Sequence, residues 1–215
     1  QRIDARDSQR YAPWIAYLQD SDKTQGYGDA LRPQQANSSL ATLDKYFDEA
    51  MTMVSGAAQA DFHTYLPDDL MVKMDIASMA YGLEARSPLL DEKLLNWAMA
   101  IPDIHRFPPG QTKGLFKASL SSILPASVLN RPKSGFGVPL KSWLSGELLS
   151  YSRDLLYSDE FRGRDLIRPD FVDKLFSEHE SGRYFHHPRI WALVMLELWF
   201  RMWIDPPAGA EIGRR

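Results

Sequence analysis

The segment Asn130–Pro139 combines the residue types that bind an anion. It carries two cations, Arg131 and Lys133, and two glycines, Gly135 and Gly137. Its prolines restrict the backbone, and its glycines let main-chain amides approach a ligand closely. A lysine ammonium held in such a loop can neutralise a leaving phosphate or pyrophosphate as a compact charge. We therefore predict an anion-binding loop centred on Lys133, with a solvated loop lysine as the alternative.

A second group of charged residues lies upstream, in the stretch from Gly82 to Asp91. Glu84 and Arg86 are two residues apart between two predicted helices, where side chains can converge on a ligand. An arginine there can hold a carboxylate or phosphate by two parallel hydrogen bonds, and a glutamate can accept a proton. Spacing alone favours a structural ion pair between them. Asp75 lies in the middle of the preceding helix. It either faces the same pocket or pairs with a neighbouring residue on a solvated face. We interpret the two patches as walls of one pocket.

Histidine and tryptophan residues give no comparable signal. His186 and His187 are adjacent, and adjacent loop residues seldom chelate one metal, so we predict no metal site. Three tryptophans near the C-terminus fall at helical spacing and are predicted to lie in the core rather than to form a stacking platform: Trp191, Trp199 and Trp203.

Composition excludes several classes of protein. The chain has 25 Lys plus Arg against 28 Asp plus Glu, so it lacks the basic field that recruits nucleic acid. Cysteine is absent, which excludes a thiolate metal site or a cysteine nucleophile in this chain and is typical of a reducing compartment, which we take to be the cytoplasm. No stretch reaches the ~18 uninterrupted apolar residues of a membrane span, because the most apolar one, Ile190 to Phe200, contains Glu197.

Apolar residues recur at a spacing of three to four along most of the chain, which predicts a mainly helical protein. We expect a poorly defined segment over 1–38, a helical domain over 39–205 and a disordered tail over 206–215. Because the chain begins with Gln rather than Met, we also expect it to be part of something longer. The predicted helices span Leu40–Val54, ended by Gly56, then Pro67–Gly82, a segment capped by Asp91, Thr112–Leu124, Leu140–Leu144, Leu148–Leu156, Pro169–Gly182 and Ile190–Ile204, the last being the most buried.

Several blocks in this order carry a family resemblance. They are LPDDLMVKMD (66–75), SMAYGLEARSPLLD (78–91), GQTK (110–113), LPASVL (124–129) and RPKSGFGVPL (131–140). Together they resemble the C-terminal part of the synthetase domain of glutamine-hydrolysing asparagine synthetases, which are class II amidotransferases. The residues before 40 and after about 150 add little to the resemblance.

The resemblance implies a ligase reaction. ATP, with Mg²⁺, adenylates the side-chain carboxylate of aspartate, pyrophosphate leaves, and glutamine-derived ammonia attacks the aspartyl-AMP to give asparagine and AMP. The resemblance implies that Lys133 contacts the pyrophosphate and stabilises developing charge. It further implies the roles of the other candidates: Glu84 is catalytic, Arg131, Gly135 and Lys113 contact the nucleotide, and Arg86 and Asp75 face the substrate.

Two elements of that family do not occur in these 215 residues: the nucleotide loop Ser-Gly-Gly-x-Asp-Ser and the glutaminase cysteine. We therefore interpret the chain as the helical C-terminal half of an α/β ATP-pyrophosphatase (adenine nucleotide alpha hydrolase-like) domain. We expect it to be inactive without the glutaminase and ATP-loop segments of the same polypeptide. The sequence is also compatible with a homodimer. Two alternatives remain. One is an amidotransferase of this fold acting on another carboxylate, as in surface-sugar amidotransferases or β-lactam synthetases, for which Ser87 in place of an aliphatic residue is a hint. The other is a noncatalytic helical module that binds a partner through its C-terminal helix.

Overall fold

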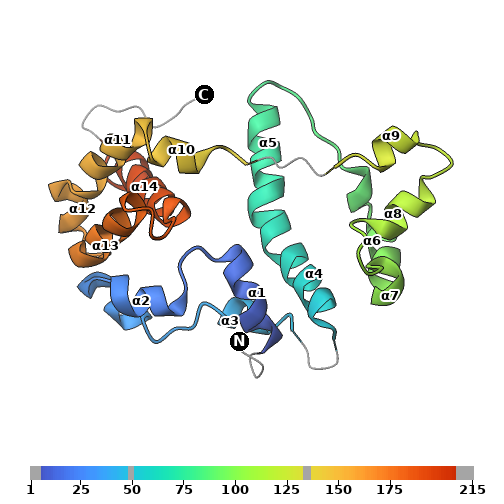
Figure 1. Ribbon diagram of the computed structural model, residues 1–215, viewed down its shortest axis with the longest axis horizontal. Coiled ribbons are helices and arrows are strands. Elements are labelled where there is room, and N and C mark those ends of the chain that lie inside the picture. Colours follow the sequence, from blue (N-terminus) through green and yellow to red (C-terminus); the bar gives the residue numbers. More distant parts are fainter. Residues whose placement is uncertain (1–5, 48–50, 133–136, 207–215) are drawn as a thin grey trace. The chain divides into compact units, whose positions relative to one another are not determined.

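The computed structural model describes residues 6–47, 51–132 and 137–206, and the chain divides into two compact units (Figure 1). Unit 1 comprises Gln1–Tyr11 and Thr42–Gly135, and unit 2 comprises Ala12–Ala41 and Phe136–Arg215. The described residues form helices and no strand, apart from one isolated antiparallel bridge between Tyr27 and Ile167. The prediction of a mainly helical protein is confirmed. None of the described helices combines the length and the apolar character that a membrane crossing requires.

Unit 2 holds the hydrophobic core. Its C-terminal helices are α10 (Leu140–Leu144), α11 (Glu147–Leu156), α12 (Asp159–Gly163), α13 (Pro169–Glu180) and α14 (His187–Trp199), followed by the π-helical turn η4 (Phe200–Ile204). The buried apolar side chains cluster on these helices, and the fully buried members include Leu144, Leu156, Phe176, Ile190 and Leu193. The predicted helices beginning at Leu140 and Pro169 are confirmed, and Gly182 ends the second with a φ of +70°.

The N-terminal segment of unit 2 packs against these helices through its backbone. It contains the end of α1 (Asp7–Ile15), α2 (Asp20–Gly26) and the 3-10 turn η1 (Asp29–Gln34). The Gly28 amide donates to the Leu166 carbonyl at 2.8 Å, and the Arg168 amide donates to the Gly26 carbonyl at 2.8 Å. A Cβ at Gly28 would lie 2.2 Å from the backbone oxygen of Asp165. Only glycine therefore permits this approach.

Near its start, unit 1 has two helices where the sequence predicts one. The single helix predicted over 40–54 is wrong, because α3 (Ala41–Asp44) is short and α4 (Met53–His63) starts anew; residues 48–50 lie outside the described residues. The Thr52 hydroxyl caps α4 by accepting from the Ser55 amide. Gly56 does not end a helix but lies inside α4, where a Cβ would come within 2.4 Å of the Phe47 ring. Close packing explains this glycine.

The rest of unit 1 is a series of helices with little core. The π-helical segment η2 (Leu66–Met71) links α4 to α5 (Val72–Met79) in a nearly continuous rod (Figure 1). The 3-10 turn η3 (Pro88–Leu90), α6 (Glu92–Ala100), α7 (Asp103–Arg106), α8 (Gly114–Ser119) and α9 (Ala126–Leu129) follow. Of residues 64–132, all of which the structure describes, Gly114 alone is buried. Even the large apolar side chains of Leu94 and Ile123 are exposed.

The C-terminal helix is buried on one face and exposed on another. In α14 the residues Ile190, Leu193 and Val194 are buried, but the prediction that this helix is the most buried is wrong, because α13 has five buried residues and α14 has four. Trp199 and Trp203, predicted to lie in the core, are about half exposed, and Trp191 packs on the edge of the core. Spacing gives the face of a helix but does not reveal which faces meet a neighbour. The predicted tail over 206–215 lies outside the described residues except for Pro206.

Candidate functional site

The connection between α5 and α6 carries two of the candidate residues. α5 ends in a turn in which the Gly82 amide donates to the Met79 carbonyl and the Leu83 amide to the Ser78 carbonyl, each at 3.0 Å. Gly82 has a φ of +66°, a conformation that glycine adopts without strain and that commonly ends helices. The turn therefore directs the following residues away from the helix axis.

Glu84 and Arg86 lie in the extended stretch that follows this turn. Residues two apart in an extended chain point to the same side, and their side chains form an ion pair at 3.0 Å. The side chains of Arg86 and Glu84 are 81% and 69% exposed, so the pair contributes at most about 1 kcal/mol to stability. The pair that spacing favoured is present, and both groups remain accessible to a ligand.

The far end of the connection is anchored by a helix cap. Ser87 precedes Pro88, which starts η3, and the Asp91 carboxylate accepts from the amides of Lys93 and Leu94 at 3.1 Å each. The predicted N-cap at Asp91 is thus confirmed. Such a cap contributes about 1 kcal/mol. The connection is fixed at both ends while its acid and base lie exposed in the middle.

The structure does not bring the other described candidates together with this pair. Asp75, Lys113 and Arg131 are exposed, and within the described part of the chain their side chains make no ion pair or hydrogen bond with Glu84 or Arg86. Lys113 has a φ of +57° at the start of α8, a conformation uncommon outside glycine. Gly114 follows it, and a Cβ there would lie 2.4 Å from the Pro108 ring.

Lys133 and Gly135 lie outside the described residues. Their role in binding an anion, and the shared pocket formed by the two patches, stay predictions. On the near side of this gap, Arg131 follows α9, and its amide donates to the Val128 carbonyl at 3.3 Å.

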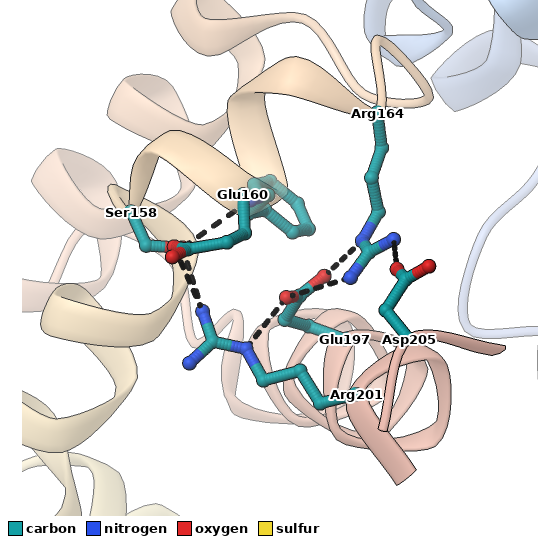
Figure 2. Close-up of polar contacts among 7 residues, drawn as sticks. Ser158, Glu160, Arg164, Glu197, Arg201 and Asp205 are labelled. Carbon is teal, nitrogen blue, oxygen red and sulfur yellow. Dashed lines mark hydrogen bonds and ion pairs between the residues drawn. The ribbon is translucent and has the colours of Figure 1, made fainter. Parts of the chain in front are cut away.

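A different charged cluster, which the sequence analysis missed, lies in unit 2 (Figure 2). The Glu197 side chain on α14 is fully buried and accepts from two arginines. The Nε atoms of Arg164 and Arg201 lie 2.6 and 2.7 Å from its two carboxylate oxygens. The hydrogen bond to Glu197 raises the pKa of Arg164 above its usual value. A buried carboxylate is stable only when it is paired in this way.

The same arginines reach outward to other elements. Arg164 pairs with Asp205 at 2.5 Å, and Arg201 donates to the Ser158 hydroxyl at 2.8 Å. A pocket of about 530 Å³ lies beside the network and is lined by Glu160, Gly163, Arg164, Arg201 and Asp205. Each arginine already pairs with a carboxylate. The cluster is therefore a structural ion-pair network that holds α12, α14 and η4 together. The spacing of Glu197 and Arg201, one helical turn apart, was its only sequence signal.

The described residues contain no group of three or more His, Asp or Glu side chains that could hold a metal ion.

The sequence of the chain is similar to a family model and to known proteins. The family model described as asparagine synthase matches residues 3–201. Asparagine synthetase [glutamine-hydrolyzing] 1 of Bacillus subtilis is 31% identical over 178 residues, which cover 81% of this chain and 28% of that protein. A putative asparagine synthetase [glutamine-hydrolyzing] of Mycobacterium tuberculosis is 34% identical over 154 residues, 71% of this chain and 23% of that protein. The corresponding Gallus gallus enzyme is 27% identical over 164 residues, 68% of this chain and 29% of that protein. The chain thus spans less than a third of the length of these relatives, and no solved structure matches it significantly.

Proposed function

The chain belongs to the asparagine synthase family, and from that premise we propose that it is the helical C-terminal part of the synthetase domain of a glutamine-hydrolysing asparagine synthetase. The observation that carries the proposal is the family match over residues 3–201, together with relatives named as such enzymes. The ATP-pyrophosphatase fold would be completed by segments outside these 215 residues. We place the enzyme in the cytoplasm.

The proposed reaction has two steps. An oxygen of the aspartate side-chain carboxylate attacks the α-phosphorus of ATP, the bond to the β-phosphate breaks, and pyrophosphate leaves. Ammonia from glutamine then attacks the acyl carbon of the aspartyl-AMP, loses a proton, and displaces AMP to give asparagine. The first step needs positive charge at the departing pyrophosphate, and the second needs a proton acceptor.

The candidate residues supply groups of both kinds. We propose that Lys133 neutralises the departing pyrophosphate, with Arg131, Lys113 and the Gly135 amide assisting. Glu84 accepts the proton of the attacking ammonia. The exposed pairing of Glu84 with Arg86 supports this role, because neither group is committed to the core.

On the substrate side, Arg86 holds a carboxylate of aspartate and Asp75 its amine. The described residues do not form a site for the Mg²⁺ that accompanies ATP, so we assign no residue to the metal and derive no step from it.

The proposal is tested with the complete polypeptide that contains these residues, incubated with ATP, aspartate and ammonium. We expect AMP, pyrophosphate and asparagine in equal amounts. Formation of ADP and phosphate, or AMP formation that does not depend on aspartate, would contradict it. Replacing aspartate by other small carboxylates in the same assay tests the related amidotransferases.

One specific observation favours a second candidate. Met195, Trp199, Met202 and Trp203 are all exposed on α14 and η4, and the first three are spaced at i, i+4 and i+7. Methionine and aromatic residues are enriched in protein interfaces. A binding module that docks a partner through this stripe needs no aspartate-dependent AMP formation, so the same assay separates the two.

A further inference from the structure

One face of α5 is apolar and exposed. Val72, Ile76 and Met79 are spaced at i, i+4 and i+7 and therefore share a face. All three are exposed, and Ile76 shows 66% of its surface. A surface helix normally turns such a stripe toward a core. Within the described part of unit 1, nothing buries this one.

The opposite face of α5 is apolar as well. Met74 lies about half a helical turn from Ile76, Ala77 follows it by three residues, and Tyr81 lies in the turn directly after the helix. All three are exposed, and Tyr81 shows 92% of its surface. A helix that is apolar on opposite sides is typical of a helix packed between two layers.

Burial energetics also favour a covered α5. Burying a side chain such as Val, Ile or Met stabilises a fold, whereas ordering each residue costs conformational entropy. Residues 64–132 are ordered with a single buried residue, Gly114. Their helices therefore need apolar cover from elsewhere.

The relatives indicate what supplies this cover. The chain accounts for only 28% of the Bacillus subtilis relative and 23% of the Mycobacterium tuberculosis relative, so most of such a polypeptide is available to pack on these helices. A second copy of this chain is less suitable. Covering two opposite faces with further copies needs at least two contacts per copy, which builds an assembly larger than a dimer.

We propose that α5 is an internal helix of the assembled synthetase, covered on both faces by the part of the same polypeptide that lies outside these 215 residues. The inference rests on the proposed function only in taking the chain as part of a longer synthetase. It gives α5 a positioning role, because the helix leads directly into the Gly82 turn and the exposed Glu84–Arg86 pair. A helix clamped on both sides fixes the start of that connection.

Thiol accessibility tests this cover without any measurement of activity. The 215 residues contain no cysteine, so Ile76→Cys and Met74→Cys place one thiol on each face of α5. Ser150→Cys, on the exposed side of α11 in unit 2, is the control. Each variant of the complete polypeptide is alkylated with iodoacetamide, native and unfolded in urea, and the rate is read by mass spectrometry of the peptide that holds the thiol.

We expect both α5 thiols to react at least about tenfold more slowly in the native protein than in urea, because a thiol in a packed interface reacts only when the structure opens. Ser150→Cys should differ by less than about twofold on the same principle. Native rates equal to those in urea at both α5 positions overturn the inference, and protection of one face alone overturns the two-sided cover. Protection that increases with protein concentration would show that a second copy of the polypeptide covers α5. That result would also overturn the inference. Protection without aspartate-dependent AMP formation supports the inference while contradicting the proposed function.

Discussion

The Nδ1 atom of His186 lies 3.0 Å from the Nη1 atom of Arg189. A guanidinium only donates hydrogen bonds, so Nδ1 accepts and the ring proton lies on Nε2. Nε2 is 2.7 Å from the Glu178 carboxylate, and this hydrogen bond lowers the pKa of Glu178. Arg189 also donates to the Tyr17 carbonyl at 3.0 Å and to Asp22 at 3.1 Å. A single arginine thus joins the N-terminal segment of unit 2 to its C-terminal helices.

Removing Arg189 should lower the unfolding free energy of unit 2. Arg189→Met keeps the aliphatic stem but leaves the buried Nδ1 of His186 without a donor, which costs about 1 to 3 kcal/mol of unfolding free energy. Urea unfolding followed by tryptophan fluorescence measures the change. Arg168→Met is the control, because its ion pair with Asp170 is exposed and should contribute little. Equal effects of the two substitutions would refute the bridging role of Arg189.

The buried Glu197 should be the most sensitive charge in unit 2. Glu197→Ala leaves Arg164, whose side chain is mostly buried, without its main partner, and we expect a loss of about 3 to 5 kcal/mol in unfolding free energy. Glu160→Ala removes an exposed partner of Arg201, at 3.5 Å, and should change little. A Glu197 variant as stable as the Glu160 variant would show that the network does not hold the helices together.

Two histidines, the buried His179 and the partly buried His187, make unit 2 sensitive to acid. Burial lowers the pKa of His179 and His187 from 6.5, and their ring centroids are 6.4 Å apart. Between the lowered values and 6.5 the unfolded chain binds more protons than the folded chain. The contribution of the two neutral histidines to the unfolding free energy is therefore complete above pH 6.5. It is lost as the pH falls from there to their lowered pKa values.

Unfolding free energies measured in steps from pH 7.5 to pH 5 test this linkage, since one group contributes at most about 1.4 kcal/mol per pH unit. The decline should be shallower in His179→Phe, which keeps an aromatic ring in the buried position but cannot be protonated. A decline identical to that of the wild type would assign the acid sensitivity to other groups.

Local signals in the sequence predicted elements whose neighbours lie close in the chain. Pro169 and Gly182 bracket α13 as expected, Asp91 caps α6, and the Glu84–Arg86 pair forms across two residues. Each depends on backbone preferences or on contacts within one turn.

Features set by distant contacts were missed. Gly56 has no room for a side chain because the Phe47 ring packs against it. The buried Glu197 is paired by Arg164, which lies 33 residues away in the chain. The exposure of Trp199 depends on which face of α14 meets the core, which helical spacing leaves open.

The proposed pyrophosphate contact predicts a selective loss of one activity. In the complete polypeptide, Lys133→Ala should lower asparagine synthesis by about 100-fold or more, because it removes charge stabilisation from the departing pyrophosphate, while glutamine hydrolysis survives. Lys93→Ala, on the exposed side of α6, is the matched control for loss of a lysine. Normal synthesis by the Lys133 variant would refute the assignment. The 215 residues alone should show no aspartate-dependent exchange of pyrophosphate into ATP.

The exposed Glu84–Arg86 pair predicts that activity and stability separate at this site. Glu84→Gln cannot accept a proton, so asparagine synthesis should fall by about 100-fold, whereas the unfolding free energy should hardly change because both side chains are exposed. Asp69→Asn, which removes the exposed partner of Lys73 at 4.0 Å, is the control and should alter neither quantity. Synthesis at the wild-type rate would show that the pair has no catalytic role. A loss of synthesis accompanied by an equal loss of stability would instead mean that the pair holds the connection between α5 and α6 in place.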